Sequence, residues 1–301
     1  MSLFPPPSNV IAAPESPGLP PLPQPLKTDR PIRWLGDDGK NVFIEIQGQL
    51  ACVAVRKGPL SYERKKRAEI NGFSAASRLR LFKTINRLEF ERAGRCTFVT
   101  ATWRDELGRP EPGEITRARS NFQKSIERMA EKELPGVWRV EWQLRKSGEY
   151  KDEYMPHLHV IYFKIPFLEV KDVGKAWARA IGTDEHVSVK MNEIKEMQQC
   201  MYYIGKYVAK IDFDCNLDIP SYLGKQLGGR KWGIYRKNEM PFADRHEIRV
   251  APGELVEKIR SIAIEAWDKT PQHPEEGFTV FGPRTRDIQE IVDQWCLQLP
   301  D

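Results

Sequence analysis

The sequence predicts an α+β fold in which two helices cover one face of an antiparallel sheet. The middle of the chain alternates in the order β-α-β-β-α-β, which is the ferredoxin-like arrangement. The 301 residues are 40% hydrophobic and 30% charged, a composition typical of a globular protein that can bury a core. No stretch approaches the ~18 uninterrupted apolar residues of a membrane-spanning helix, so no membrane association is expected.

The N-terminal part of the chain is expected to be accessory. Residues 1–31 hold ten of the 23 prolines and predict a disordered or polyproline-like tail. From Asn41 to Arg56, two apolar runs predict short strands joined around Gly48. The stretch from Ser74 to Arg92 has helical spacing. We therefore treat 32–94 as a basic accessory region.

The central region, 95–235, contains the predicted sheet. Strands are expected at 95–103, 137–145, 157–163 and 185–191, with helices at 116–134, 169–181 and about 193–210. The second of these helices should end at Gly182, since glycine favours the left-handed position that closes a helix. A short strand near 232–235 follows, and helices near 254–267 and 285–297 make 236–301 a helical C-terminal extension.

Positive charge is concentrated in one part of the chain. The net charge is +5, but 56–95 contains twelve Lys or Arg and only four Asp or Glu. Clustered charge is typical of a polyanion-binding segment, although a solvated helix face would give the same pattern. The candidate DNA-binding residues are Arg64, Lys65, Lys66, Arg67, Arg78 and Arg80.

The cysteines indicate a reducing compartment. There are five, scattered along the chain and without a C-x-x-C pair, which argues against a disulfide framework or a zinc finger. The N-terminus has no basic segment followed by an apolar run, so no secretory signal is expected. We expect a cytoplasmic protein of a bacterial host cell.

Two histidines form the strongest local signal. His157 and His159 lie two residues apart in a run typical of a strand, so both imidazoles face the same side of the sheet and can converge on one metal ion. Two hydrogen-bonded or exposed histidines on a sheet are the alternative.

The preceding strand strengthens the metal interpretation. Its alternation places Glu141, Gln143 and Arg145 on one face. Two imidazoles and a carboxylate suit Mg²⁺ or Mn²⁺, so Glu141 is the predicted third ligand, with Gln143 as the alternative. An exposed polar sheet face remains the other interpretation of this strand.

A second signal lies in the segment YYIGKYVAK, residues 202–210. On a helix, Tyr203, Lys206, Tyr207 and Lys210 share one stripe. A phenol has a pKa of about 10 and is a weak nucleophile, but a neighbouring ammonium favours the phenolate and neutralises charge on a phosphate. Such a stripe suits attack on a phosphodiester. A helix that buries its tyrosine rings while its lysines reach solvent is the alternative.

Together, and in this order, these motifs resemble those of the HUH rolling-circle replication initiators. Phe98-Val99-Thr100-Ala101-Thr102 matches the first motif, an apolar strand ending in threonines, with Ala101 in place of a commoner large residue. The histidine pair matches the second motif, and Tyr203 to Lys210 the third. The presence of both Tyr203 and Tyr207 resembles the two-tyrosine branch of phages and plasmids. Residues 229–233, GRKWG, resemble a downstream element of some relatives, and the resemblance covers roughly 95–235.

The resemblance implies both a fold and a reaction. The fold would be the HUH endonuclease fold, a ferredoxin-like or RRM-like sheet with the tyrosine helix across its metal-binding face. His157, His159 and Glu141 would hold Mg²⁺ or Mn²⁺. One tyrosine would nick single-stranded origin DNA through a 5′-phosphotyrosine, leaving a 3′-hydroxyl for a host polymerase, and the other would rejoin the displaced strand. The chain has no P-loop motif, so a host helicase would act in trans.

Two alternatives remain open from the sequence. An HUH transposase or relaxase of a mobile element would use the same chemistry. A non-catalytic ferredoxin-like nucleic-acid-binding protein belongs to another class, but such modules usually display aromatic residues on the sheet. The histidines and glutamate on the predicted strands favour an enzyme.

Overall fold

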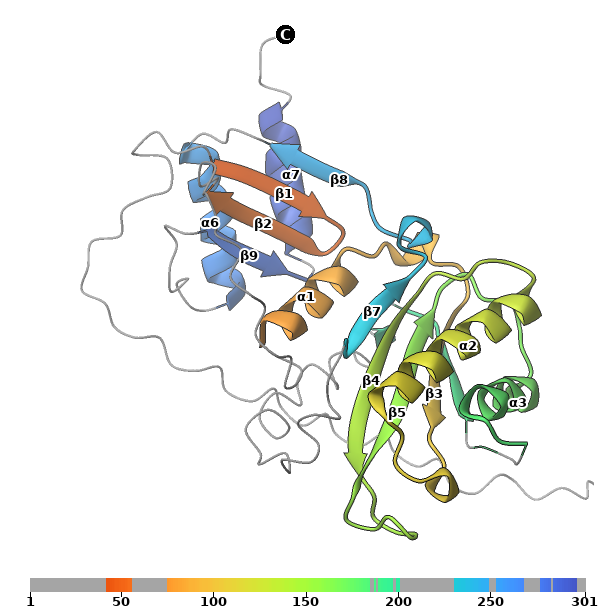
Figure 1. Cartoon of the computed structure of the whole chain (residues 1–301). Coiled ribbons are helices and arrows are strands. Elements are labelled where there is room, and N and C mark those ends of the chain that lie inside the picture. The colour runs from red at the N-terminus through yellow and green to blue at the C-terminus, as the bar shows by residue number, and fades with distance from the viewer. Residues whose placement is uncertain are drawn as a thin grey trace, which may run out of the picture.

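The structure, a computed structural model, describes residues 42–55, 75–184, 187, 189–196, 199–200, 230–248, 253–267, 277–282 and 284–296. These residues form two antiparallel sheets and five α-helices, as Figure 1 shows. The prediction of an α+β fold is confirmed.

The larger sheet has five strands, all antiparallel to their neighbours. They are β3 (Cys96–Thr102), β4 (Gly136–Leu144), β5 (Tyr154–Tyr162), β6 (Val189–Ile194) and β7 (Trp232–Tyr235). Their order across the sheet is β6-β3-β5-β4-β7. The neighbouring strands β3 and β5 are those in which the sequence placed the threonines and histidines.

One face of this sheet, called here the helix face, is covered by α2 (Pro112–Ala130) and α3 (Val170–Ile181) (Figure 1). Phe122 of α2 and Trp177 of α3 are buried in one cluster with Leu158 and Val160 of β5. The indole N–H of Trp177 also donates to the carbonyl of Thr102, at 2.8 Å. Both helices therefore bury their apolar stripes against the same side of the sheet.

The ends of these two helices follow their local sequence. Helix α2 begins at Pro112, earlier than the predicted Thr116, because proline suits the first helical turn. The backbone N–H of Glu111 donates to the carboxylate of Glu114 at 2.9 Å, which stabilises this start. Helix α3 ends as predicted at Gly182, which has φ of +84°.

The smaller sheet joins segments from both ends of the described chain. Its strands are β1 (Val42–Gln47), β2 (Leu50–Val55), β8 (Arg245–Ile248) and β9 (Gly277–Phe281), in the order β8-β1-β2-β9. Helices α6 (Gly253–Trp267) and α7 (Thr285–Cys296) share a buried cluster with Ile44 and Val53. Strands β1 and β2 and both helices were predicted, whereas β8 and β9 were not. Residues 32–94 and 236–301, predicted as separate regions, thus contribute strands to one sheet.

Helix α1 (Ala75–Asn86) lies between the two sheets (Figure 1). Leu81 and Ile85 are buried in a cluster with apolar side chains of the larger sheet. On the other side of α1, the ring of Phe82 lies 4.7 Å from that of Phe281 in β9. The helix ends before the predicted Arg92, because the chain leaves it and Leu88 forms an isolated bridge with Phe242.

Strand β6 corrects one prediction. The sequence placed a strand at 185–191 and began a helix near Glu193, but β6 continues to Ile194. It does so because its backbone pairs with β3 up to the Cys96–Ile194 position, and Ile194 is buried in the same cluster as Leu81 and Ile85 of α1. No helix in the described part of the chain is both long and apolar enough to cross a membrane.

Candidate functional site

The predicted metal ligands lie on the face of the larger sheet opposite α2 and α3, called here the histidine face. Strand alternation places Thr100 and Thr102 of β3 on this face, since Val99 and Ala101 are buried on the helix face. In the strand register, Thr100 lies opposite His159, and Thr102 lies opposite His157. Each histidine therefore has a threonine beside it on the neighbouring strand.

His159 is the most enclosed histidine of the site. Its side chain is 4% exposed, and its ring stacks on Phe98 with 5.6 Å between ring centres. Its Nδ1 lies 3.1 Å from the hydroxyl oxygen of Thr100, and its Nε2 lies 3.0 Å from Oε2 of Glu141. Both ring nitrogens thus have a polar partner, which fixes the orientation of the imidazole.

Glu141 is buried as deeply as His159, with a side chain that is 1% exposed. Besides contacting His159, the carboxylate accepts a hydrogen bond of 2.7 Å from the side-chain amide of Gln143. A buried carboxylate costs free energy unless it has such partners. The glutamate predicted as third ligand and its predicted substitute, Gln143, therefore contact one another.

His157 is more accessible than His159. Its Nδ1 lies 3.2 Å from the hydroxyl oxygen of Thr102, repeating the contact of His159 with Thr100. The two imidazole rings are nearly parallel, at 10°, and their centres are 6.3 Å apart. Parallel rings at this separation do not point their Nε2 atoms at one position. Accordingly, no three His, Cys, Asp or Glu side chains within the described ranges stand close enough to hold a metal ion as they are placed.

The other predicted site residues are only partly described. Tyr203, Lys206, Tyr207 and Lys210 lie outside the described residues, as do Arg64, Lys65, Lys66 and Arg67. Arg78 and Arg80 lie on α1, where the side chain of Arg80 is exposed. The structure therefore places the proposed metal ligands on one sheet face, while the proposed nucleophiles remain predictions.

Two hydroxyl contacts were missed by the sequence analysis. Thr100 and Thr102 were noted as the end of an apolar strand, but no role was given to their side chains. Their two-residue spacing equals that of His157 and His159, a signal that could have paired them. Recognising it required knowing that β3 and β5 are neighbours.

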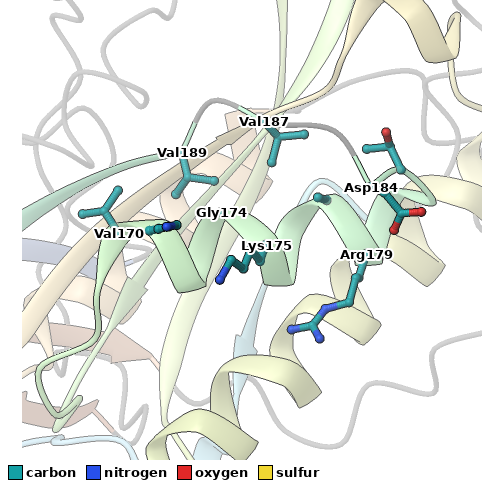
Figure 2. A pocket seen from close by; sticks show the side chains of 10 residues that line it. Val170, Gly174, Lys175, Arg179, Asp184, Val187 and Val189 are labelled. Atoms are coloured by element: carbon teal, nitrogen blue, oxygen red, sulfur yellow. The ribbon is translucent and has the colours of Figure 1, made fainter.

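A cavity of about 670 Å³ lies away from the histidine face, between α3 and β6. Figure 2 shows that Lys175 and Arg179 project from α3 beside it, with Val187 and Val189 on its other side. Gly174 also lines it. It contains none of the predicted site residues, so the chemistry expected from the sequence belongs to the histidine face.

Comparison with known proteins gives one match. Residues 96–212 match the model of a family described as replication-associated protein ORF2. No curated protein and no solved structure matches the chain. The matched residues include β3 to β6, with both histidines and Glu141, and extend over Tyr203 and Tyr207. The match supports a replication initiator protein, which interacts with DNA.

Proposed function

We propose that this protein is a rolling-circle replication initiator that nicks and rejoins single-stranded origin DNA through a 5′-phosphotyrosine intermediate. One observation carries the proposal. Within the segment that matches the replication-associated family, a buried histidine and a buried glutamate lie 3.0 Å apart beside a second histidine on the same sheet face. Ionisable groups that are buried together in this way are typical of sites that bind or react.

The strand order supports the finer fold assignment. Taken in chain order, β3-α2-β4-β5-α3-β6 is the predicted β-α-β-β-α-β sequence, and its strands lie in the order β6-β3-β5-β4 with both helices on one face. This arrangement supports a ferredoxin-like sheet of the HUH type, extended at one edge by β7. The reaction would take place on the opposite face.

The donor set fits a divalent ion. Mg²⁺ binds its ligands at about 2.1 Å, so two adjacent ligands of an octahedral site are about 3 Å apart. The distance of 3.0 Å between Nε2 of His159 and Oε2 of Glu141 matches that separation. His157, which is more accessible, would complete the set by turning its ring towards Glu141. The nearby hydroxyls of Thr100 and Thr102 would then hold the Nδ1 atoms, as outer partners of metal-binding histidines do.

The residues of the chain would divide the work as follows. A bound Mg²⁺ or Mn²⁺ would neutralise charge on the scissile phosphate. Tyr203 or Tyr207 would attack phosphorus through its phenol oxygen, forming a tyrosine–phosphate ester while the bond to the 3′ oxygen breaks. The phenol proton passes to solvent, and the departing 3′ oxygen takes up a proton to become a hydroxyl. Lys206 and Lys210 would favour the phenolate.

The products fit a primer for replication. The free 3′-hydroxyl would be extended by a host polymerase after a host helicase opens the duplex. The second tyrosine would later cut the displaced strand, and the 3′-hydroxyl would attack the first phosphotyrosine to close a circle. Holding the scissile phosphate beside a preset nucleophile supplies much of the rate.

The test is a cleavage assay on single-stranded DNA that carries the origin of the protein's own replicon. Denaturing gels would measure covalent protein–DNA adducts with Mn²⁺, with Mg²⁺ and with EDTA. The variants are Tyr203→Phe, Tyr207→Phe and His157→Ala, with Tyr150→Phe in the β4–β5 loop as the matched control.

The proposal expects a metal-dependent adduct that Tyr150→Phe retains, that His157→Ala loses, and that one or both of the other tyrosine variants lose. Tight DNA binding with no cleavage under any metal would contradict it and favour a binding module. An adduct that persists in a Tyr203→Phe, Tyr207→Phe double variant would contradict the assigned nucleophiles.

A further inference from the structure

His159 lies in a row of side chains that crosses the whole of the larger sheet. In the strand register, Thr100 lies opposite both Lys190 of β6 and His159 of β5. On the other side, Arg139 of β4 lies opposite both His159 and Trp232 of β7. From edge to edge, the row contains Lys190, Thr100, His159, Arg139 and Trp232.

The buried neighbours show that this row lies on the histidine face. Val189 and Met191, on either side of Lys190, pack against the core on the helix face. Trp138 and Val140, on either side of Arg139, are buried in the same core. Since successive residues of a strand point to opposite faces, Lys190 and Arg139 point to the face that carries His159.

Each neighbouring row has a different character. On one side lie Phe98, Ile161 and Val137, which are buried in the cluster beneath α1. On the other side lies the row of Thr102, His157 and Glu141. The row through His159 is therefore the boundary between the part of the histidine face that α1 covers and the part that carries the polar site.

The charges in this row have one sign. Lys190 is exposed and Arg139 is half-buried, and the row contains no acidic residue. Three strand spacings of about 4.8 Å separate the two cations, so they lie about 14 Å apart, with His159 between them. A site that receives a phosphodiester needs such charges on either side, because the neighbouring phosphates also lose water.

We propose that Lys190 and Arg139 bind the backbone phosphates on either side of the scissile phosphate, so that single-stranded DNA crosses the sheet along this row. The inference rests on the proposed function, because it takes the scissile phosphate to lie at His159. The DNA runs across the strands, from the β6 edge towards β7. Lys190 and Arg139 are positioning residues, since they hold the strand and do not touch the reacting atoms.

The experiment measures DNA binding without cleavage. Fluorescence anisotropy of a labelled, mixed-sequence single-stranded oligonucleotide would be followed in EDTA over a range of salt concentrations. The variants are Lys190→Gln and Arg139→Gln. Lys124→Gln is the matched control, because Lys124 is an exposed lysine on α2, which covers the opposite face. Arg139→Lys tests whether charge, rather than packing, is what Arg139 supplies.

A single-strand phosphate contact adds about −0.7 to the slope of log K against log salt. We therefore expect each Gln variant at Lys190 and Arg139 to make this slope shallower by about 0.7, while Lys124→Gln and Arg139→Lys keep the wild-type value. If Lys190→Gln and Arg139→Gln bind with the slope of Lys124→Gln, the row does not bind phosphates and the inference is wrong.

The cleavage assay separates this inference from the function on which it rests. Shallower slopes in a protein that forms no adduct would support the row and contradict the nicking reaction. Unchanged slopes in a protein that forms the adduct would overturn the row and leave the nicking reaction intact.

Discussion

The carboxylate of Glu141 contacts His159, although Glu141 lies opposite His157 in the strand register. It reaches the diagonal neighbour, a distance that a long side chain can span on a twisted antiparallel pair. As a result the glutamate joins the buried histidine, while the more accessible histidine contacts Thr102. The predictions below test these contacts and the packing around them.

Glu141→Gln should weaken metal binding without unfolding the protein. The amide keeps the shape of the carboxylate but loses its negative charge, so Mn²⁺ affinity is expected to fall by about 10- to 100-fold. Isothermal titration with Mn²⁺ would measure the change, and Glu149→Gln in the exposed β4–β5 loop is the control. Equal affinities in the two variants would remove Glu141 from the ligand set.

Thr100→Val should destabilise the protein more than Thr102→Val does. Valine leaves Nδ1 of the buried His159 without its hydroxyl partner, which should cost about 1–3 kcal/mol of unfolding free energy. His157 is more accessible, so water can replace the hydroxyl of Thr102 and the cost should stay below about 1 kcal/mol. Urea unfolding would compare the two variants, and Thr100→Ser should restore stability. Equal losses in both would contradict the assigned contacts.

Gly233→Ala should be destabilising because of its neighbour Trp138. A Cβ atom at Gly233 would lie 2.7 Å from Cζ2 of Trp138, whose indole is held from another side by the Arg119 guanidinium at 3.9 Å. Overpacking of this kind costs about 1–3 kcal/mol. Gly113→Ala is the control, because a Cβ at Gly113 meets no atom within 4 Å. Thermal unfolding would measure both, and a neutral Gly233→Ala would show that the ring can move aside.

Lys231→Met should stabilise the protein at neutral pH. Lys231 is buried, and burial lowers its pKa from 10.5 to about 8. Below the lower value the folded protein holds a poorly solvated ammonium, so an apolar side chain of similar length should gain about 1–3 kcal/mol at pH 7.

The pH dependence of this gain has a defined sign. Between about pH 8 and pH 10.5, the unfolded state binds more protons at this lysine than the folded state does. The wild type therefore becomes more stable relative to the variant as pH rises through this range, and the gain shrinks. Urea unfolding of Lys231→Met, the exposed control Lys237→Met and the wild type at several pH values would test this. A gain that does not change with pH would contradict the lowered pKa.

Much of the fold followed from local patterns in the sequence. The alternation of β4 and β5 placed Glu141, His157 and His159 on one face, and the structure agrees. Gly182 ended α3 as predicted, because a left-handed residue closes a helix at low cost only when it is glycine. These features depend on residues that are near one another in the chain, so their spacing is sufficient to predict them.

Other features could not be predicted in this way. Strand β8 has exposed side chains at three of its four positions and shows no alternation, while β9 has only five residues. Both strands are stabilised by pairing with β1 and β2, which lie near the other end of the described chain. The sequence contains no local sign of such a pairing.

The amino-acid sequence by itself determined which side chains share a face of each strand, where α3 ends, and which motifs resemble those of replication initiators. Only the tertiary structure decided that Glu141 meets His159, and that Lys190 and Arg139 flank it in one row. The reason is physical. The period of a strand is set by its own backbone, whereas the neighbours and register of strands are set by the packing of α1, α2 and α3 against the whole sheet.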